Sequence, residues 1–341
     1  MEKNNNNKHK ENKILFIVPP NITFEDFVSP PNNISTITKN KGKDQFGSLI
    51  TDMPIGIISL SSYLKQKNNC KIKVIDFNVK LNQELSFTYN SFYEYFMSVL
   101  NREEYINFMP DFIGITAMFT PAYESLIDIS RITKKIFKNT LILVGGNLPT
   151  SMYRKILEDS KSIDAVCYGE GELPFEDLLK VNDKISLLNN HSSWITNKNK
   201  SSESFQHSFI YDLDEIPILD YDILDLEGYK LNPTSSRYSV SENYMTKFHG
   251  KMNIGEKSIG KGEIDKIYGH SMPIMTSRGC PYHCTFCASH AAHGRKMRYH
   301  SPERVINDVK MMIKKFGING IVIQDDHFMG GGRRPYEIMS N

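Results

Sequence analysis

Five short apolar runs, separated by stretches with helical periodicity, constrain the fold of this chain more than any other feature. The runs occupy residues 14–18, 72–76, 112–116, 141–144 and 163–167. A continuous apolar run of this length is typical of a strand that is buried on both faces of a parallel sheet. Helical patterns follow Asp52, Pro121 and the last of the runs. The alternation predicts an α/β fold with a doubly wound, Rossmann- or flavodoxin-like parallel sheet of five strands.

Small residues follow the carboxyl ends of several predicted strands. Thr116 ends the third run, Gly145-Gly146 follows the fourth and Gly169 follows the fifth. In doubly wound sheets, ligands bind beyond the carboxyl ends of the strands. Two interpretations stay open at this point. Either these residues form a ligand site, or the glycines serve only the turns while Glu170 and Glu172 only favour the start of the next helix.

Three cysteines near the end of the sequence have the spacing C-x3-C-x2-C, at Cys280, Cys284 and Cys287. They follow the apolar run at residues 272–275, which predicts a strand that leads into a cysteine-rich loop. Cubane iron–sulfur clusters and structural zinc sites use four ligands, one more than these thiolates supply. Either a cluster keeps one iron open for a small molecule, or a histidine completes a zinc site. The histidines near the loop are His283, His290 and His293.

The residues around the cysteines resemble the signature of the radical S-adenosylmethionine enzymes. Phe286 precedes the third cysteine, Ser277-Arg278-Gly279 precedes the first, and Pro281 follows it. The resemblance implies a [4Fe–4S] cluster on the three cysteines, with S-adenosylmethionine bound at the open iron and cleaved to a 5′-deoxyadenosyl radical. It places Phe286 on the S-adenosylmethionine side of the site. It also implies an electron donor of the flavodoxin or ferredoxin type.

A strand predicted at residues 321–324 ends in Asp325 and Asp326. In the resembling family this strand end faces the active site, which implies that both carboxylates contact S-adenosylmethionine or substrate. The alternative is that they cap the next turn. Before this strand, Ser301 as an N-cap and Pro302 in the first turn predict a helix. A basic cluster just upstream has two interpretations, a contact with a carboxylate or phosphate, or a solvated face, which is the expectation. Its members are Arg295, Lys296, Arg298 and His300.

The part of the chain from about residue 13 to residue 180 resembles the cobalamin-binding domain that precedes the radical domain in one branch of this family. The resemblance rests on Pro19-Pro20, the 114–116 strand end, Gly145-Gly146 and the turn at 169–172. It implies cobalamin as a cofactor. Since residues 10–190 contain no histidine, this domain places no imidazole on cobalt. The residues that the resemblance assigns to cobalamin are Thr116, Gly145, Gly146, Gly169, Glu170 and Gly171.

The expected organisation has four parts. These are a disordered tail at 1–12, the cobalamin-binding-like domain at 13–180, a connector and insertion at 181–271, and the start of a TIM-like radical barrel at 272–341. Within the connector, residues 181–206 are rich in Asn, Ser and Lys and are expected to form a surface excursion rather than core. Few residues follow Cys287, so the barrel is expected to be incomplete and the chain to be a truncated copy, a fragment or half of a split protein.

The composition of the chain bears on which classes of partner and which cell compartment are expected. With 41 basic and 39 acidic residues the net charge is +2, which favours neither nucleic acid nor an anionic membrane surface. No apolar run approaches the ~18 residues of a membrane span, and five cysteines beside a cluster motif favour a reducing cytoplasm over a disulfide framework.

The leading hypothesis is a cobalamin-dependent radical S-adenosylmethionine enzyme that performs radical methyl transfer, or carbon-frame rearrangement, on a small-molecule or natural-product substrate. The alternatives are a radical enzyme of the same superfamily that uses no cobalamin, and a zinc-stabilised binding module without catalytic activity.

Overall fold

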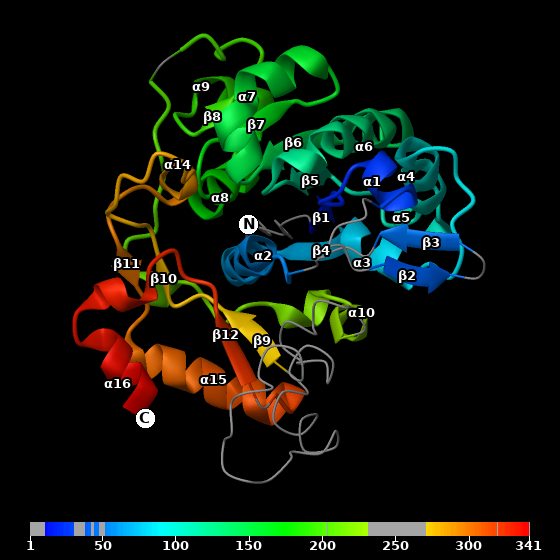
Figure 1. Ribbon diagram of the computed structural model, residues 1–341. Coiled ribbons are helices and arrows are strands. Elements are labelled where there is room, and N and C mark those ends of the chain that lie inside the picture. The colour runs from blue at the N-terminus through cyan, green and yellow to red at the C-terminus, as the bar shows by residue number, and fades with distance from the viewer. Residues whose placement is uncertain are drawn as a thin grey trace, which may run out of the picture. The chain divides into compact units, whose positions relative to one another are not determined.

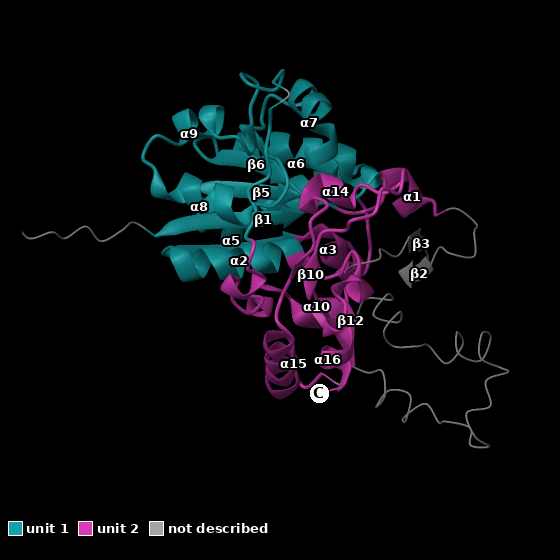
Figure 2. Cartoon of the chain, turned by 90° about the vertical axis from the view of Figure 1, so that its left-hand side faces the viewer, with its two compact units in different colours: residues 1–19, 56–75, 89–210 teal, residues 20–55, 76–88, 211–341 magenta. Residues whose placement is uncertain are grey.

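The computed structural model describes residues 11–30, 38–41, 44–47, 52–202, 204–230, 271–318 and 320–340. The chain divides into two compact units (Figure 2). Unit 1 contains residues 1–19, 56–75 and 89–210, and unit 2 contains residues 20–55, 76–88 and 211–341. Most of the predicted tail, and residues 231–270 of the predicted insertion, lie outside the described residues. The domain boundaries drawn from the sequence stay predictions.

Unit 1 is built on a sheet of six strands in the order β4-β1-β5-β6-β7-β8 (Figure 1). β5 pairs in parallel with β1 and with β6, and β6 pairs in parallel with β7. All five predicted strands are present, and the predicted fold class is confirmed. The order places the topological switch point between β1 and β5, as in flavodoxin-like sheets. The strands are β1 (Asn12–Val18), β4 (Cys70–Asp76), β5 (Phe112–Thr116), β6 (Leu141–Gly145), β7 (Ala165–Cys167) and β8 (Trp194–Ile195).

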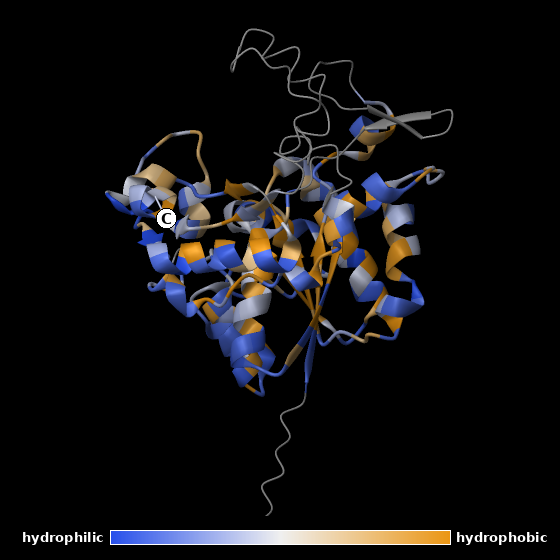
Figure 3. Cartoon of the chain, turned by 90° about the horizontal axis from the view of Figure 1, so that it is seen from below, coloured by the Kyte–Doolittle hydropathy of each residue, from blue (hydrophilic) through white to orange (hydrophobic). Residues whose placement is uncertain are grey.

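Helices pack against this sheet through apolar stripes, while their polar residues face outward (Figure 3). In α6 (Tyr123–Ile136) the stripe consists of Leu126, Ile129 and Ile132, which are fully buried. Their spacing of three residues keeps them on one side of the helix. In α8, Phe175 packs edge-on against Phe16 of β1, with 6.1 Å between ring centroids. The other helices of this part are α2 (Ile55–Lys67), α4 (Phe92–Leu100), α5 (Glu103–Ile106), α7 (Asn147–Asp159) and α9 (Lys184–Asn190), and α8 itself spans Glu172–Lys180.

The expectation of a surface excursion at residues 181–206 was wrong for its middle part. β8 adds a sixth, antiparallel strand to β7, and it carries Trp194, which is 1% exposed. The indole Nε1–H of Trp194 donates to the Pro174 carbonyl at 3.1 Å. Leu188 of α9 is buried as well. A few large apolar side chains therefore hold this segment in the core, although its composition is dominated by polar residues.

Unit 2 contains short elements from three parts of the sequence. Its first two parts form α1 (Phe24–Val28), the hairpin β2 (Thr38–Lys41) and β3 (Asp44–Gly47), and α3 (Phe77–Gln83). The connector from residue 211 forms the 3₁₀ helices η2 (Leu213–Glu215) and η3 (Tyr221–Ile223) and the helix α10 (Leu226–Lys230). This connector packs on the C-terminal part, because the Tyr221 hydroxyl donates to the Pro273 carbonyl at 2.7 Å. On another side, the Tyr229 hydroxyl donates to the buried carboxylate of Asp76 at 2.6 Å.

The C-terminal part of unit 2 contains the predicted strand, helix and strand. β9 (Ser271–Ile274) and β12 (Gly320–Ile323) pair in parallel, and α15 (Pro302–Phe316) connects them in sequence. The Ser301 hydroxyl accepts from the Arg304 N–H, and Gly317 ends the helix in the left-handed conformation, as the cap signals predict. This is a βαβ unit, the repeating element of a TIM-like barrel. The remaining elements are β10 (Ser277–Arg278), α14 (Ser289–His293), β11 (Arg298–Tyr299), η4 (Phe328–Gly331) and α16 (Arg334–Ser340).

A helix that crosses a membrane must be both long and apolar. Across the described residues, every helix is too short or too polar to cross a lipid bilayer.

Candidate functional site

The residues predicted to contact cobalamin meet at the carboxyl edge of the sheet in unit 1. Thr116 and Gly145 are register partners at the ends of β5 and β6. The Ala117 N–H donates to the Gly145 carbonyl at 3.1 Å, which continues this pairing past the strand end. Gly169, Glu170 and Gly171 follow β7, the next strand in the sheet. Parallel strands thus bring together residues that are up to 55 positions apart in the sequence.

Gly146 has a backbone that other residues rarely adopt. Its φ is +100° and its ψ is −179°, directly before α7. A Cβ at this position would lie 2.7 Å from the Ala117 carbonyl oxygen, and that oxygen accepts from the Leu148 N–H at 3.2 Å. By contrast, a Cβ on Gly145 would lie 3.6 Å from the Cys167 Cβ, an ordinary contact. The turn therefore requires glycine at one of the two positions.

The turn after β7 is buried and polar. Gly169 has φ +84° and donates its N–H to the Thr150 hydroxyl at 3.2 Å. Glu170 and Glu172 are 6% and 4% exposed. The Glu172 carboxylate accepts from the Ser59 hydroxyl at 2.8 Å, so it joins α8 to α2 in addition to any effect on the helix dipole. Burial raises the pKa of the Cys167 thiol in this turn, which keeps it protonated.

An aromatic group beside this turn was missed by sequence reasoning. Tyr168 lies between Cys167 and Gly169, and its ring centroid is 4.8 Å from that of His207 and 6.2 Å from that of Phe205. His207 stacks on Phe209, with 4.8 Å between ring centroids. The imidazole next to the β7 turn comes from beyond the histidine-free residues 10–190 and was not predicted. The alternation of ring residues at 205, 207 and 209 was the available signal.

The carboxyl edge has the features that a cobalamin site needs. Bare backbone at Gly146 permits close approach at the start of α7, whose helical backbone is interrupted at Met152. Met118 and Phe119, directly after the end of β5, are 59% and 52% exposed and offer apolar surface to a flat ring system. Thr116 adds a hydroxyl at the same edge. The residues present therefore fit the cofactor that the resemblance implies.

The cysteine loop lies in unit 2 and is closed by a short hairpin. β10 and β11 pair antiparallel, with Ser277 opposite Tyr299 and Arg278 opposite Arg298, and residues 279–297 form the loop between them. Gly279 starts the loop with φ +90°, and a Cβ there would lie 2.6 Å from the Lys296 carbonyl oxygen. The two ends of the loop therefore approach as closely as their backbones allow.

The three cysteines are free thiols on this loop. Cys284 is exposed, and Cys280 and Cys287 are intermediate. The Cys287 N–H donates to the Cys284 carbonyl at 3.2 Å, and Phe286 is 91% exposed. Within the described ranges, no three side chains of His, Cys, Asp or Glu converge on one point as metal ligands would. The donor chemistry, three accessible thiols on one loop, fits a cluster with three protein ligands.

Asp325 and Asp326 follow β12 and face the start of the cysteine loop. The Asp325 carboxylate accepts from the backbone N–H and the hydroxyl of both Thr276 and Ser277. Asp326 accepts from the Gly279 N–H at 3.2 Å. These carboxylates thus hold an earlier strand end, a role that differs from the cap of their own turn considered in the sequence. Whether they also contact S-adenosylmethionine stays a prediction.

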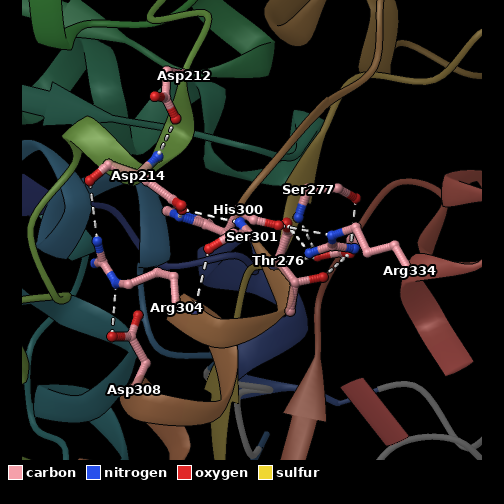
Figure 4. A network of polar contacts seen from close by, with 10 residues as sticks. Asp212, Asp214, Thr276, Ser277, His300, Ser301, Arg304, Asp308 and Arg334 are labelled. Atoms are coloured by element: carbon pink, nitrogen blue, oxygen red, sulfur yellow. Dashed lines mark hydrogen bonds and ion pairs between the residues drawn. The ribbon is translucent and has the colours of Figure 1, made fainter. Parts of the chain in front are cut away.

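The expectation of a solvated face was wrong for half of the basic cluster. Arg298 and His300 are 3% and 8% exposed. The His300 imidazole Nδ1 lies 3.1 Å from a carboxylate oxygen of Asp214 in the connector (Figure 4). Burial, followed by the nearby Arg304 charge, lowers the pKa of His300 to about 4. Arg295 donates to the Tyr282 carbonyl in the cysteine loop. Tertiary contacts from segments distant in sequence cover the two buried residues, which local composition does not reveal.

Sequence comparison relates one part of the chain to a known domain family. Residues 52–179 match the model of the B12 binding domain family. An uncharacterised methyltransferase of Pyrococcus horikoshii is 28% identical over 289 residues, which cover 84% of this chain and 52% of that protein. The anaerobic magnesium-protoporphyrin IX monomethyl ester cyclase of Rubrivivax gelatinosus is 24% identical over 66% of this chain and 35% of its own length. The chain thus spans about half or less of these relatives.

A solved structure shares the fold. It is the cobalamin-dependent S-adenosylmethionine radical enzyme OxsB with aqua-cobalamin and S-adenosylmethionine bound. The TM-score is 0.59 at 20% identity, and the match covers 97% of this chain and 37% of that one. The match to the B12 binding domain family thus ends about a hundred residues before the cysteine loop at residues 279–297, and the solved structure shows a shared fold.

Proposed function

We propose that the protein is part or all of a cobalamin-dependent radical S-adenosylmethionine enzyme, and that its reaction is methyl transfer to a carbon of a small-molecule or natural-product substrate. The observation that carries the proposal is the combination of a B12 binding domain with a three-cysteine loop in one chain. The methyltransferase name of the Pyrococcus relative supports methyl transfer. The cyclase name of the Rubrivivax relative keeps carbon-frame rearrangement as the second candidate.

Each cofactor has a proposed set of residues. Cys280, Cys284 and Cys287 would hold a [4Fe–4S] cluster, with Phe286 and Asp326 toward S-adenosylmethionine. The edge formed by the ends of β5, β6 and β7 would hold cobalamin. When bound, the cluster and S-adenosylmethionine supply a carbon-centred radical and cobalamin supplies a methyl group. The residues assigned to cobalamin are Thr116, Gly145, Gly146, Gly169, Glu170 and Gly171.

The residues of the chain would position the cofactors and exclude water from them. The hairpin of β10 and β11 joins both ends of the cysteine loop, so the three thiols belong to one closed loop. The glycine at 146 keeps the edge of the sheet open to a large ring, and the exposed Met118 and Phe119 would exclude water beneath it. A flavodoxin or ferredoxin type of electron donor and a reducing cytoplasm complete the proposal.

The test is anaerobic reconstitution of the purified chain with iron and sulfide, followed by EPR of the reduced protein with and without S-adenosylmethionine. We expect about four irons per chain for one cubane cluster, and a signal that changes when S-adenosylmethionine is added. The control is the replacement of Cys70 by Ala, outside the loop, against replacement of Cys284 by Ala within it. Bound zinc without a cluster signal would instead select the binding module.

Cobalamin is tested separately, by titration with hydroxocobalamin. Trp194 is the only tryptophan of the chain and lies in the sheet of unit 1, so quenching of its fluorescence reports binding at that unit. Saturable quenching is expected for the wild-type protein. A cluster signal without cobalamin binding would select a radical enzyme that uses no cobalamin.

A further inference from the structure

The cysteine loop starts from a turn that is held by one carboxylate. β9 ends at Ile274, and the loop begins after Ser277 and Arg278 of β10. Between them, the N–H groups of Thr276 and Ser277 donate to Asp325 Oδ1 at 2.6 and 3.0 Å. Their hydroxyls donate to Asp325 Oδ2 at 2.6 and 2.7 Å. Four donors from two consecutive residues thus converge on one side chain.

This arrangement fills the acceptor capacity of Asp325. An ionised carboxylate has about four lone-pair positions, two on each oxygen. Each oxygen of Asp325 accepts two hydrogen bonds, so every position is used. A ligand amine or hydroxyl would have to displace one of these donors. Asp326 differs: it is exposed, and its one hydrogen bond here, from the Gly279 N–H, uses a single oxygen.

The same turn is held from its carbonyl side. The Arg334 guanidinium of α16 donates to the carbonyl oxygens of Thr276 at 2.5 Å and His300 at 2.7 Å (Figure 4). It lies over the Tyr299 ring, 5.2 Å from the ring centroid. The two carbonyls belong to the segments that lead into and out of the loop, and the His300 N–H also donates to the Thr276 carbonyl at 3.0 Å. Asp325 therefore binds the N–H and hydroxyl groups of the loop stem, and Arg334 binds its carbonyl groups.

We propose that Asp325 is a positioning residue for the cysteine loop, and that it acts on the cluster through the Thr276–Ser277 turn rather than by contact with S-adenosylmethionine. The inference rests on the proposed function, in which this loop holds the cluster. Charge-assisted bonds to four donors fix the direction in which the chain enters the loop. The adjacent carboxylate, Asp326, keeps an oxygen available for a ligand.

The test compares Asp325→Asn with Asp308→Asn in the reconstituted full chain. Asn has one acceptor oxygen, and its NH₂ group would face donors, so two of the four bonds are lost. We expect iron incorporation to fall by at least about tenfold in D325N, since two bonds to a charged group are lost and each contributes about that factor or more. Asp308 is a partly buried carboxylate of α15 that pairs with Arg304 of its own helix at 2.7 Å. D308N should incorporate iron like the wild-type protein.

A second measurement separates positioning from loss of the fold. In the apoprotein, the rate of alkylation by iodoacetamide is measured for each cysteine by mass spectrometry. D325N should change the rates of Cys280, Cys284 and Cys287 and leave the rate of Cys70, in unit 1, unchanged. Should D325N fail to fold, Thr276→Val removes one hydroxyl donor, leaves the backbone donors in place and should give a smaller change in the same direction.

The outcomes are distinct. Wild-type iron content in D325N would overturn the proposal, and wild-type iron content with loss of the S-adenosylmethionine effect on the EPR signal would assign Asp325 to direct contact instead. Should the wild-type chain assemble no cluster, the proposed function fails. The positioning role is then read from alkylation alone: equal loop rates in D325N and D308N would overturn it, and a loop-specific change would support it.

Discussion

Replacement of Gly146 by Ala should destabilise unit 1, whereas the same replacement at Gly145 should not. At φ +100° and ψ −179°, Gly146 lies in a region that is essentially restricted to glycine and costs other residues about 1–3 kcal/mol. The new Cβ would also lie 2.7 Å from a backbone carbonyl oxygen, and relief of such crowding costs about 1–3 kcal/mol more. The expected loss in the free energy of unfolding is therefore about 2–6 kcal/mol.

The assay is urea denaturation followed by the fluorescence of Trp194, which reports on the sheet. With a slope of about 2 kcal/mol per molar urea, a loss of ~3 kcal/mol lowers the midpoint by ~1.5 M. At Gly145 the added methyl group makes an ordinary contact at 3.6 Å, so G145A should stay within about 1 kcal/mol of the wild-type protein. Equal midpoints for the two variants would refute the argument from backbone conformation. Where G146A folds, its hydroxocobalamin titration should show weaker binding than that of G145A.

Three further predictions concern buried polar groups. Burial lowers the pKa of His300 to about 4, below the ~6.5 of an unfolded histidine, so the unfolded state binds more protons between these values. Stability should fall by about 3 kcal/mol as the pH drops from 6.5 to 4, and His300→Gln should remove this slope in urea titrations at several pH values. Ser59→Ala deletes the bond to Glu172 and should lower stability by about 1–3 kcal/mol, measured by Trp194 fluorescence; an unchanged midpoint contradicts it. Tyr229→Phe deletes the bond to the buried Asp76 and should lower the free energy of unfolding by about 1–3 kcal/mol, measured by thermal unfolding. An unchanged melting temperature would contradict a strong bond.

Local signals in the sequence were sufficient for the regular elements. The five predicted strands of the sheet are rich in apolar residues, and the Ser301 cap with Gly317 as the stop defines α15 within the accuracy of any boundary. The two-residue strands β8, β10 and β11 were missed, because two residues show no periodicity. They exist through pairing with distant segments, which is a property of the folded chain.

Some contacts in the candidate sites could be predicted from the sequence and others could not. The meeting of Thr116 with Gly145 follows from strand order alone, because the carboxyl ends of parallel strands share an edge. The contacts of Asp325 were not predictable, since its partners lie 48 and 49 positions earlier in the sequence. The presence of a carboxylate indicates a possible ligand contact, and only the folded structure shows that its lone pairs are already used.

Hydrogen bonds between the connector and the C-terminal part determine where a recombinant fragment should begin. Asp214 accepts from the Ser301 N–H and from His300, and Tyr221 donates to the Pro273 carbonyl. A recombinant fragment that starts at Ser271 would lack these partners and would expose a buried imidazole and a helix start to water. A fragment that starts at Tyr211 keeps them. Expression of the cysteine loop apart from residues 52–179 should therefore begin at Tyr211, sixty residues before β9.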